Sequence, residues 1–418
     1  MTATLSQVLA PDAAIPRRDA VLHPQSFADA LAEYLGRIGR PVQVTAGRRL
    51  RARYHVGRSL RVLHEVDVDE KRFLVAARTF PRDPVDIARK ARDLAVPTRA
   101  LPPVIPLLEL GAVAWVYPND RKLKGLAELA TTIAALIERD RVELELVSWA
   151  PERSVTVRCE TPHAYAKAYA EPTAAREHRF HEELGARLGA SDEVTIPRVL
   201  ASGADVLVVE AGAGRSLATA DSSDAVRAYA RYGRALARLH SLAPPPDAES
   251  FERFEPVRLG AAAALIGRAR PDAGDAATTL ARELAERRPE RATRACLHGD
   301  AHPKNVLDDG ARITLIDLEQ VSAGAAVAEI GSVLAVLGYR ALTGRLDEET
   351  AERCRNAFLE AYGDEGPLAR APAIAWHTAA ALLTERALRA ITRVRDDGLH
   401  CLPAVLRLAK ATFSREGA

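Results

Sequence analysis

Two successive stretches of the chain alternate between apolar and polar residues with the period of β-strands. In the first stretch an amphipathic helix, 26–38, with Ser26 placed to cap it, precedes a group of predicted antiparallel strands. The predicted strands are 49–54, 60–68, 72–79 and 113–117, with a second helix at 85–94. Residues 1–24 hold prolines among small and charged residues, which predicts a loose leader.

The same order of elements returns after residue 142. Strands are predicted at 143–148, 154–159, 164–170 and 205–210, with a helix at 174–188. Segments of the two stretches can be laid over each other at an offset of about 90 residues, for example FLVAARTF over HAYAKAYA. The overlay favours an internal duplication. The alternative is that two unrelated meanders look alike in Ala-, Val- and Arg-rich sequence.

Helical periodicity replaces the alternation after residue 220. The predicted helices are 224–242, 257–269, 274–288, 325–340, 349–362, 371–394 and 402–415. One β-rich segment, 294–322, interrupts them. This order predicts an α+β fold in which a sheet-containing part precedes a mainly helical part.

Composition narrows the class of protein. A net charge of +2, from 58 basic and 56 acidic residues, leaves no electrostatic footprint for nucleic acid or a membrane surface. The four cysteines lie far apart without a C-x-x-C pair, so neither a disulfide framework nor a zinc site is indicated. No secretory pattern is visible, and no apolar run has the length of a membrane span. We therefore expect a soluble, cytoplasmic protein.

Candidate chemistry is concentrated in the β-rich segment, which contains CLHGDAHPKNVLDDGARITLIDLEQ. A turn at 308–310 followed by an apolar strand predicts a hairpin with Asp300, Asn305 and Asp317 at one end. Phosphoryl transfer needs a carboxylate that orients the attacking hydroxyl, and an amide oxygen and a second carboxylate that hold Mg²⁺. Asp300 is therefore the candidate base, and Asn305 and Asp317 are the candidate metal ligands.

The pattern H-G-D-x-x-x-x-N, followed by a strand ending in I-D-x-E, resembles the aminoglycoside phosphotransferase family of small-molecule relatives of the protein kinases. The resemblance covers roughly residues 142–418. It implies a bilobal protein-kinase-like fold, with an antiparallel β N-lobe and a mainly helical C-lobe, and the cofactors ATP and Mg²⁺. It leaves His298 with a supporting, hydrogen-bonding role.

The resemblance also assigns residues to the nucleotide. Lys167 lies in the strand where kinases keep the lysine that contacts the α- and β-phosphates. Glu177, near the start of the following helix, is expected to pair with that lysine, and Glu182 and Glu183 stay open as alternatives.

A strand ending at Glu210 resembles the kinase hinge. Backbone groups of Glu210 and Ala211 would bond the adenine edge.

Two features depart from the family pattern. Residues 148–154 replace a glycine-rich phosphate loop but contain no glycine, although backbone N–H groups of that turn could still cradle phosphate. Relatives often have an Asp a dozen residues beyond I-D, where this chain has Glu329, which we expect to be structural.

The resemblance suggests three domains. An N-terminal α+β cap domain, 1–141, precedes a kinase-like N-lobe with the hinge, 142–220, and a helical C-lobe with the catalytic and metal-binding loops, 221–418. If the duplication is real, the cap domain is a degenerate copy of the N-lobe in which Arg78 takes the position of Lys167. Sugar kinases such as maltokinase have a similar extra domain. We expect a non-catalytic cap that packs on the N-lobe or shapes the acceptor cleft.

Phosphorylation of a sugar or amino sugar hydroxyl is the leading function. A second hypothesis keeps the chemistry and changes the acceptor to an aminoglycoside, an amino-alcohol such as choline, or a nucleoside. Segments 318–345 and 366–400 hold at least as many Arg as acidic residues, which counts against a polycationic acceptor. A nucleotide-binding pseudokinase scaffold is disfavoured because the catalytic and metal-binding residue types are all present. For Glu319 the sequence leaves two roles open, recognition of the acceptor and a structural ion pair with an arginine. It leaves the oligomeric state open as well.

Overall fold

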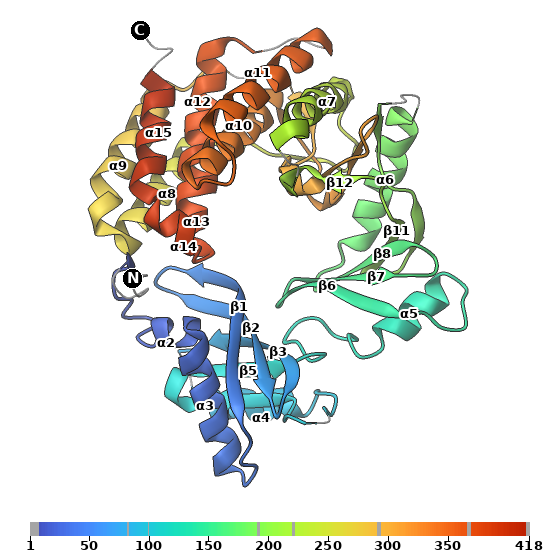
Figure 1. Cartoon of the computed structure of the whole chain (residues 1–418), viewed down its shortest axis with the longest axis vertical. Coiled ribbons are helices and arrows are strands. Elements are labelled where there is room, and N and C mark those ends of the chain that lie inside the picture. The colour runs from blue at the N-terminus through green and yellow to red at the C-terminus, as the bar shows by residue number, and fades with distance from the viewer. Residues whose placement is uncertain are drawn as a thin grey trace. The chain divides into compact units, whose positions relative to one another are not determined.

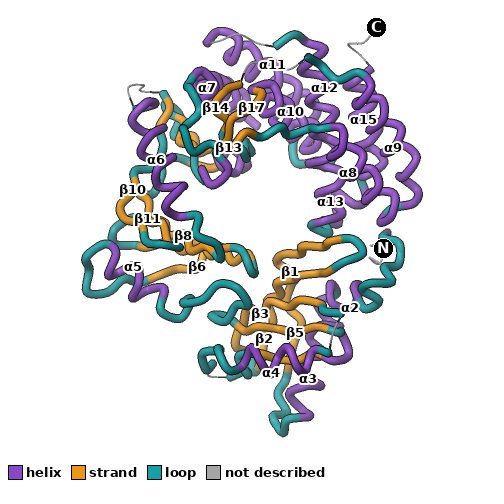
Figure 2. Tube along the Cα trace, turned by 180° about the vertical axis from the view of Figure 1, so that it is seen from behind, coloured by secondary structure: helices purple, strands orange, loops and turns teal. Residues whose placement is uncertain are grey.

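The computed structural model describes residues 8–81, 83–98, 100–189, 193–219, 222–290, 294–365 and 369–414. The chain forms two compact units. The first comprises Met1–Pro172, Gly203–Val208 and Ile391–Val394, and the second comprises Thr173–Ser202, Val209–Ala390 and Arg395–Ala418. The longer strands belong mostly to the first unit and most helices to the second. The elements are labelled in Figure 1, and helices and strands are coloured separately in Figure 2.

The first unit opens with an antiparallel sheet in the order β1-β2-β3-β5-β4. Its strands are β1 (Val44–His55), β2 (Ser59–Val68), β3 (Lys71–Thr79), β4 (Val104–Leu107) and β5 (Ala112–Val116). Helix α3 (Pro24–Arg37) packs against β1, and α4 (Pro84–Arg92) packs against β4. Phe27 of α3 is fully buried and stacks on His64 of β2, with the ring centroids 4.3 Å apart. The apolar stripe of the predicted first helix is therefore its contact with the sheet.

The leader is ordered within its described part, so the prediction of a loose segment is wrong there. Helix α2 (Arg18–Leu22) buries Val21 and Leu22 completely. Asp12 accepts hydrogen bonds from the Tyr54 hydroxyl (2.6 Å) and the Gly57 N–H (2.7 Å). The few apolar residues of this segment have no regular spacing, and their burial depends on partners far along the chain, which periodicity does not reveal.

A second sheet, most of which lies in the first unit, repeats the arrangement of the first. Its strands include β6 (Leu144–Ala150), β7 (Ser154–Cys159), β8 (Ala164–Tyr169) and β11 (Val206–Glu210). The order β6-β7-β8-β11 matches the order β1-β2-β3-β5. Arg78 lies in the third strand of the first sheet and Lys167 in the third strand of the second. Helix α5 (Leu129–Leu136), between the two sheets in sequence, was not predicted.

The second unit is mainly helical. Its helices are α6 (Ala174–Leu188), α7 (Ser222–Ser241), α8 (Pro256–Ala269), α9 (Pro271–Glu286), α10 (Ala326–Leu342), α11 (Glu348–Glu365), α12 (Ala371–Ala381), α14 (Asp396–His400) and α15 (Leu402–Ser414). Helix α13 (Leu388–Thr392) begins in this unit, and its residues from Ile391 onward belong to the first unit. Helix α7 packs on α11, α8 on α9, and α10 on α12. Helix α10 is apolar on nearly all sides and lies in the core. Within the described ranges, no helix is both long and apolar enough to cross a membrane.

Two small sheets position the β-rich segment among these helices. One has the order β12-β15-β16-β9 and the other the order β13-β17-β14. Their strands are β9 (Val194–Thr195), β12 (Arg215–Ser216), β13 (Glu249–Ser250), β14 (Arg294–Leu297), β15 (Val306–Asp308), β16 (Ile313–Leu315) and β17 (Ser322–Ala325). Strands β15 and β16 form the predicted hairpin, with Val306 opposite Leu315.

Candidate active site

The loop between β14 and β15 brings predicted residues together. Asn305 is buried and ends a short 3₁₀ turn that begins at Pro303. Its amide nitrogen donates to the carbonyl oxygen of Asp300 (3.0 Å) and to the carboxylate oxygen Oδ2 of Asp300 (3.1 Å). The Ile316 N–H donates to the Asn305 carbonyl oxygen (3.0 Å), and Asp317 is the next residue. The hairpin therefore brings Asp300, Asn305 and Asp317 to one end.

Asn305 and Asp317 present oxygens suited to a hard cation. Asp317 lies two residues beyond the end of β16. Its backbone has the left-handed conformation, with φ 66°, which non-glycine residues rarely adopt. Such backbone strain is concentrated at functional sites. Both side-chain hydrogen bonds of Asn305 to Asp300 come from the amide nitrogen, which leaves the oxygen Oδ1 for a ligand role. One carboxylate and one amide oxygen fit Mg²⁺, which keeps phosphate oxygens and waters as its other ligands.

A buried carboxylate anchors the backbone of the H-G-D segment. Glu329 of α10 is fully buried and accepts hydrogen bonds from the N–H groups of His298 (2.9 Å) and Gly299 (2.7 Å). Gly299 has φ 86°, and a Cβ there would overlap the carbonyl oxygen of Gln320. His298 Nε2 lies 3.0 Å from the Ile316 carbonyl oxygen, which ties the loop to the hairpin. These contacts agree with the structural roles expected for His298 and Glu329.

Two further partners compensate the buried charge of Glu329. His240 Nε2 lies 3.0 Å from one carboxylate oxygen, and Arg253 lies 3.5 Å from the other. Arg253 also pairs with Glu385 at 3.0 Å and donates to the Gly299 carbonyl oxygen. Burial by itself would raise the pKa of Glu329, but the hydrogen bond from His240 and the charge of Arg253 lower that pKa to about 2. Glu329 is therefore ionised at neutral pH, and its carboxylate holds the loop.

Positive charge surrounds the candidate base. Asp300 Oδ2 lies 3.2 Å from Lys304 Nζ. Burial would raise the pKa of Asp300, but the charges of Lys304 and Arg389 outweigh burial and hold it below the usual value of 3.8. Burial, helped by Arg386, lowers the pKa of neighbouring His302 to about 2, so His302 is neutral. Asp300 is thus ionised at neutral pH and suited to orient a hydroxyl by accepting its hydrogen bond.

A π-helical segment, Leu382–Ala387, interrupts what the periodicity predicts as one helix over 371–394. Its Glu385 holds Arg253 and so links this segment to the H-G-D backbone. Arg386 is also buried, 3.4 Å from Glu385, and its Nε has no hydrogen-bond partner in the described part of the chain. π-Helical segments of this kind often occur at functional sites. Here the segment places a buried ion pair, Glu385 with Arg386, near the loop that carries Asp300.

The residues predicted to bind phosphate lie on separate elements. Lys167 in β8 is opposite Thr156 of β7, and its Nζ lies 5.1 Å from the ring centroid of Tyr169. Glu177 lies in the first turn of α6, and its side chain is buried.

The two alternatives to Glu177 are paired with residues of their own helix. Glu182 lies 3.2 Å from His178, and Glu183 pairs with Arg187. Both are more exposed than Glu177, whose side chain is 3% exposed.

The predicted hinge is constrained at one of its backbone groups. Glu210 ends β11 and Ala211 follows it. The Glu210 N–H donates to the Arg198 carbonyl oxygen (2.9 Å). A contact between Glu210 and an adenine edge therefore has to be made by the Glu210 carbonyl oxygen.

In the turn between β6 and β7, the N–H groups of two residues already donate hydrogen bonds within the protein. The Glu152 N–H donates to Asp120 Oδ2 (2.9 Å), and the Arg153 N–H donates to the Ala150 carbonyl oxygen (3.0 Å). The expectation that N–H groups of this turn could cradle phosphate is therefore wrong for Glu152 and Arg153. Any contribution of the turn to phosphate binding has to come from its position and its side chains.

Comparison with known protein families supports the chemistry suggested by the loop that carries Asp300 and Asn305. A family described as the phosphotransferase enzyme family (APH) matches residues 162–382, which is more than half of the chain. The match includes Lys167, the H-G-D segment, the hairpin and α10. The chain belongs to this phosphotransferase family. The predicted family and the predicted class of enzyme, a small-molecule phosphotransferase, are both confirmed.

Solved structures give the fold of this phosphotransferase. A thermostable mutant of aminoglycoside phosphotransferase APH(4)-Ia is 16% identical, with a TM-score of 0.50 over 69% of this chain and 99% of that chain. Aminoglycoside phosphotransferase APH(3'')-Id from Streptomyces rimosus ATCC10970 is 20% identical, with a TM-score of 0.44 over 62% and 98% of the two chains. A choline/ethanolamine kinase family protein from Mesorhizobium loti is 19% identical, with a TM-score of 0.46 over 70% and 95%.

The first of these likenesses confirms the predicted protein-kinase-like α+β fold for the matched part of the phosphotransferase. No curated protein is similar enough in sequence to match the chain. The N-terminal cap domain and the three domain boundaries remain predictions.

Sequence reasoning missed several residues of the phosphotransferase site. Lys304 carried a usable signal, since only 7 of the 58 basic residues are lysines and this one lies inside the H-G-D segment. Arg253 and Glu385 carried none, because they lie 132 positions apart and meet only in the folded unit. Arg386 depends on the π-helical segment, which helical periodicity does not predict.

Proposed function

We propose that this phosphotransferase moves the γ-phosphoryl group of ATP, with Mg²⁺, to a hydroxyl group of a small polar molecule, with a sugar or amino sugar as the leading acceptor. One observation carries the proposal. The Asp300 carboxylate and the Asn305 amide are 3.1 Å apart at the end of a hairpin that runs into Asp317. An orienting carboxylate beside an amide and a second carboxylate is the set that phosphoryl transfer uses.

In this mechanism, Asp300 accepts the hydrogen bond of the acceptor hydroxyl and aims its oxygen at the γ-phosphorus. A bond forms between these atoms while the bond to the β,γ-bridging oxygen breaks, the hydroxyl proton passes to Asp300, and ADP leaves. Asn305 and Asp317 would hold Mg²⁺, which neutralises phosphate charge when bound.

The nucleotide would be held by residues of β8 and α6 and by the end of β11. Lys167, paired with Glu177, would contact the α- and β-phosphates, and Glu210 and Ala211 would contact the adenine edge through their backbones. The burial of Glu177 supports its assignment over Glu182 and Glu183. The Glu210 carbonyl oxygen suits the hinge role because the N–H of that residue is already bonded.

The charges around Asp300 bear on the acceptor. Lys304 lies 3.2 Å from Asp300, and the charge of Arg389 also acts on Asp300, whereas Arg386 is paired with Glu385. A ligand with several positive charges would be repelled there. This supports a neutral sugar or a singly charged amino sugar over an aminoglycoside.

The test is ADP release by purified protein with Mg-ATP across sugars, amino sugars, aminoglycosides, amino-alcohols and nucleosides. Turnover on one acceptor class identifies the enzyme's substrate class, and we expect it among the sugars or amino sugars. Turnover restricted to aminoglycosides would refute the proposed acceptor while keeping the chemistry. Binding of Mg-ATP without turnover on any acceptor would favour the pseudokinase scaffold.

A second prediction concerns the metal. Asp317→Asn is expected to raise the Mg²⁺ concentration for half-maximal activity at least about tenfold, because it removes one charge-assisted ligand worth roughly 1.5 kcal/mol or more. The measurement is turnover against Mg²⁺ concentration at saturating ATP. The matched control is Asp275→Asn on the exposed face of α9. An unchanged Mg²⁺ dependence in Asp317→Asn would rule this residue out as a ligand.

A further inference from the structure

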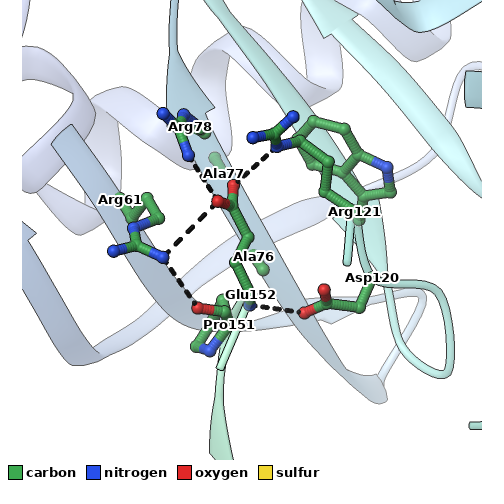
Figure 3. Close-up of a pocket in the computed structure, with 9 residues that line it drawn as sticks. Arg61, Ala76, Ala77, Arg78, Asp120, Arg121, Pro151 and Glu152 are labelled. Carbon is green, nitrogen blue, oxygen red and sulfur yellow. Dashed lines mark hydrogen bonds and ion pairs between the residues drawn. The ribbon is translucent and has the colours of Figure 1, made fainter. Parts of the chain in front are cut away.

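Three arginines converge on one carboxylate at the turn between β6 and β7. Figure 3 shows the Glu152 side chain pointing toward Arg61, Arg78 and Arg121. Arg61 Nη1 lies 3.4 Å from Oε2 of Glu152, Arg121 Nε lies 3.1 Å from Oε1, and Arg78 Nη1 donates to Oε2. The Glu152 side chain is 4% exposed, so these partners replace the water that a carboxylate would otherwise bind.

Two of the arginines come from strands of the first sheet and the third from the loop after its β5, whereas the carboxylate comes from a turn of the second sheet. Arg61 of β2 is directly opposite Arg78 of β3, and Arg121 follows β5 in the chain. Glu152 lies in the tight turn that joins β6 to β7. The cluster therefore fixes the tip of one hairpin to the face of a different sheet within the same unit.

The backbone of the turn is fixed as firmly as its side chain. The Glu152 N–H donates to Asp120 Oδ2 (2.9 Å), and the same oxygen accepts from Nε1 of the buried Trp149 (2.9 Å). Arg61 also lies 3.4 Å from the Pro151 carbonyl oxygen. Glu152 has φ 62°, a conformation that a non-glycine residue keeps only where its surroundings over-determine it.

These contacts bear on how the turn can act. A glycine-rich phosphate loop adapts to its ligand because its backbone is free, whereas this turn has no glycine and its N–H groups at Glu152 and Arg153 are already bonded. Its position is consequently set before any nucleotide arrives. Preorganised groups lose less freedom on binding and so favour tight binding.

We propose that Glu152 is a positioning residue for the nucleotide: through Arg61, Arg78 and Arg121, the first sheet holds the β6–β7 turn in the place where it bounds the phosphates. The inference rests on the proposed ATP-dependent function. It gives residues 1–141 a definite task, which is to replace the flexibility of a glycine-rich loop by a fixed support. It also explains Arg78, which occupies the third strand of its sheet as Lys167 does, yet binds a carboxylate.

The decisive variant is Glu152→Gln, which keeps the size of the side chain and removes its charge. We expect the dissociation constant for Mg-ATP, measured by calorimetry, to rise severalfold and by at most about 10²-fold, because a displacement of about 1 Å can cost that much. The KM for ATP should rise in parallel while the KM for the acceptor stays unchanged. Arg78→Met should give the same pattern, and adding it to Glu152→Gln should have little further effect, because both changes break one contact.

The matched control is Glu65→Gln. Glu65 of β2 likewise has arginine partners, Arg48 of β1 at 3.3 Å and Arg72 of β3 at 3.8 Å, but all three residues belong to the first sheet. Its ATP affinity should match that of the wild-type protein. Thermal unfolding of each variant separates a local effect on the turn from a general loss of folded protein.

Several outcomes would overturn the inference. Unchanged ATP affinity in Glu152→Gln would show that the turn does not depend on the cluster. Tighter binding or faster turnover would show that the cluster restrains the turn in an inhibited position. Equal loss of affinity for ATP and acceptor, with a lower unfolding temperature, would show a purely structural role. Failure of the wild-type protein itself to bind Mg-ATP would refute the proposed function, and the inference with it.

Discussion

Asp300→Asn is expected to lower kcat by about 10²- to 10⁴-fold, the usual cost of removing a catalytic base. The asparagine keeps an oxygen that can accept the hydrogen bond from Asn305, so the loop should retain its shape. The change removes the negative charge that we propose orients the hydroxyl and receives its proton. The measurement is steady-state ADP release on the acceptor found in the substrate panel.

The pH dependence of turnover tests the same residue in a second way. Because the folded pKa of Asp300 lies below 3.8, the carboxylate stays ionised as the pH falls toward that value. Protonation of Asp300 should therefore not reduce wild-type turnover until the pH is below 3.8. Asp275→Asn, the same chemical change on an exposed helix face, should leave kcat unchanged. Wild-type turnover in Asp300→Asn would exclude this residue as the base.

Glu329→Gln is expected to cost about 3 kcal/mol or more of unfolding free energy, because it removes one partner of a buried, hydrogen-bonded ion pair. The N–H groups of His298 and Gly299 would then share a single neutral oxygen acceptor, and Arg253 would lose part of its compensation. Turnover should fall as well, since these groups hold the H-G-D backbone. The measurement is urea unfolding at about pH 7, followed by the far-UV signal of the helices.

The sign of the pH effect follows from the lowered pKa. The folded pKa of Glu329, about 2, lies below the ordinary value of 4.5, so its contribution to stability is complete above pH 4.5 and is lost as the pH falls toward 2. The stability gap between wild-type protein and Glu329→Gln should therefore narrow between these two values. Glu286→Gln, which removes an exposed partner of Arg282, should show no comparable gap. An equal gap at about pH 3 and pH 7 would contradict the assignment.

Local spacing predicted the hairpin well, because its determinants lie within a few residues of each other. The turn at 308–310 and the apolar strand before Asp317 are enough to bring the chain back on itself, and the observed register of β15 and β16 agrees with this. The helix over 174–188 was predicted at its observed bounds, since its apolar face repeats regularly. Short α5, rich in Ala and Thr, offers little such contrast between its faces.

Long-range electrostatics could not be predicted in the same way. Arginines are usually exposed, so the sequence alone does not predict that Arg253 is buried. Only the folded unit brings it to Glu385 and Glu329. Glu152 is a similar case, because no local pattern predicts that three arginines from two other strands and a loop surround a turn residue. The fold class thus follows from periodicity, whereas the charges that tune the site follow from packing.

The π-helical segment at Leu382–Ala387 sets the angular positions of the side chains in α13, the short helix that follows it directly. An α-helix advances by about 100° per residue, so the extra residue of a wide turn rotates later side chains by roughly that angle relative to an uninterrupted helix. Arg389 lies beyond the segment, and its charge acts on Asp300 from the rotated face. A single-residue deletion within the segment is expected to restore regular winding and to move Arg389 away from Asp300. The alignment of this positive charge with the active site therefore depends on the count of residues in one helical turn as much as on their identity.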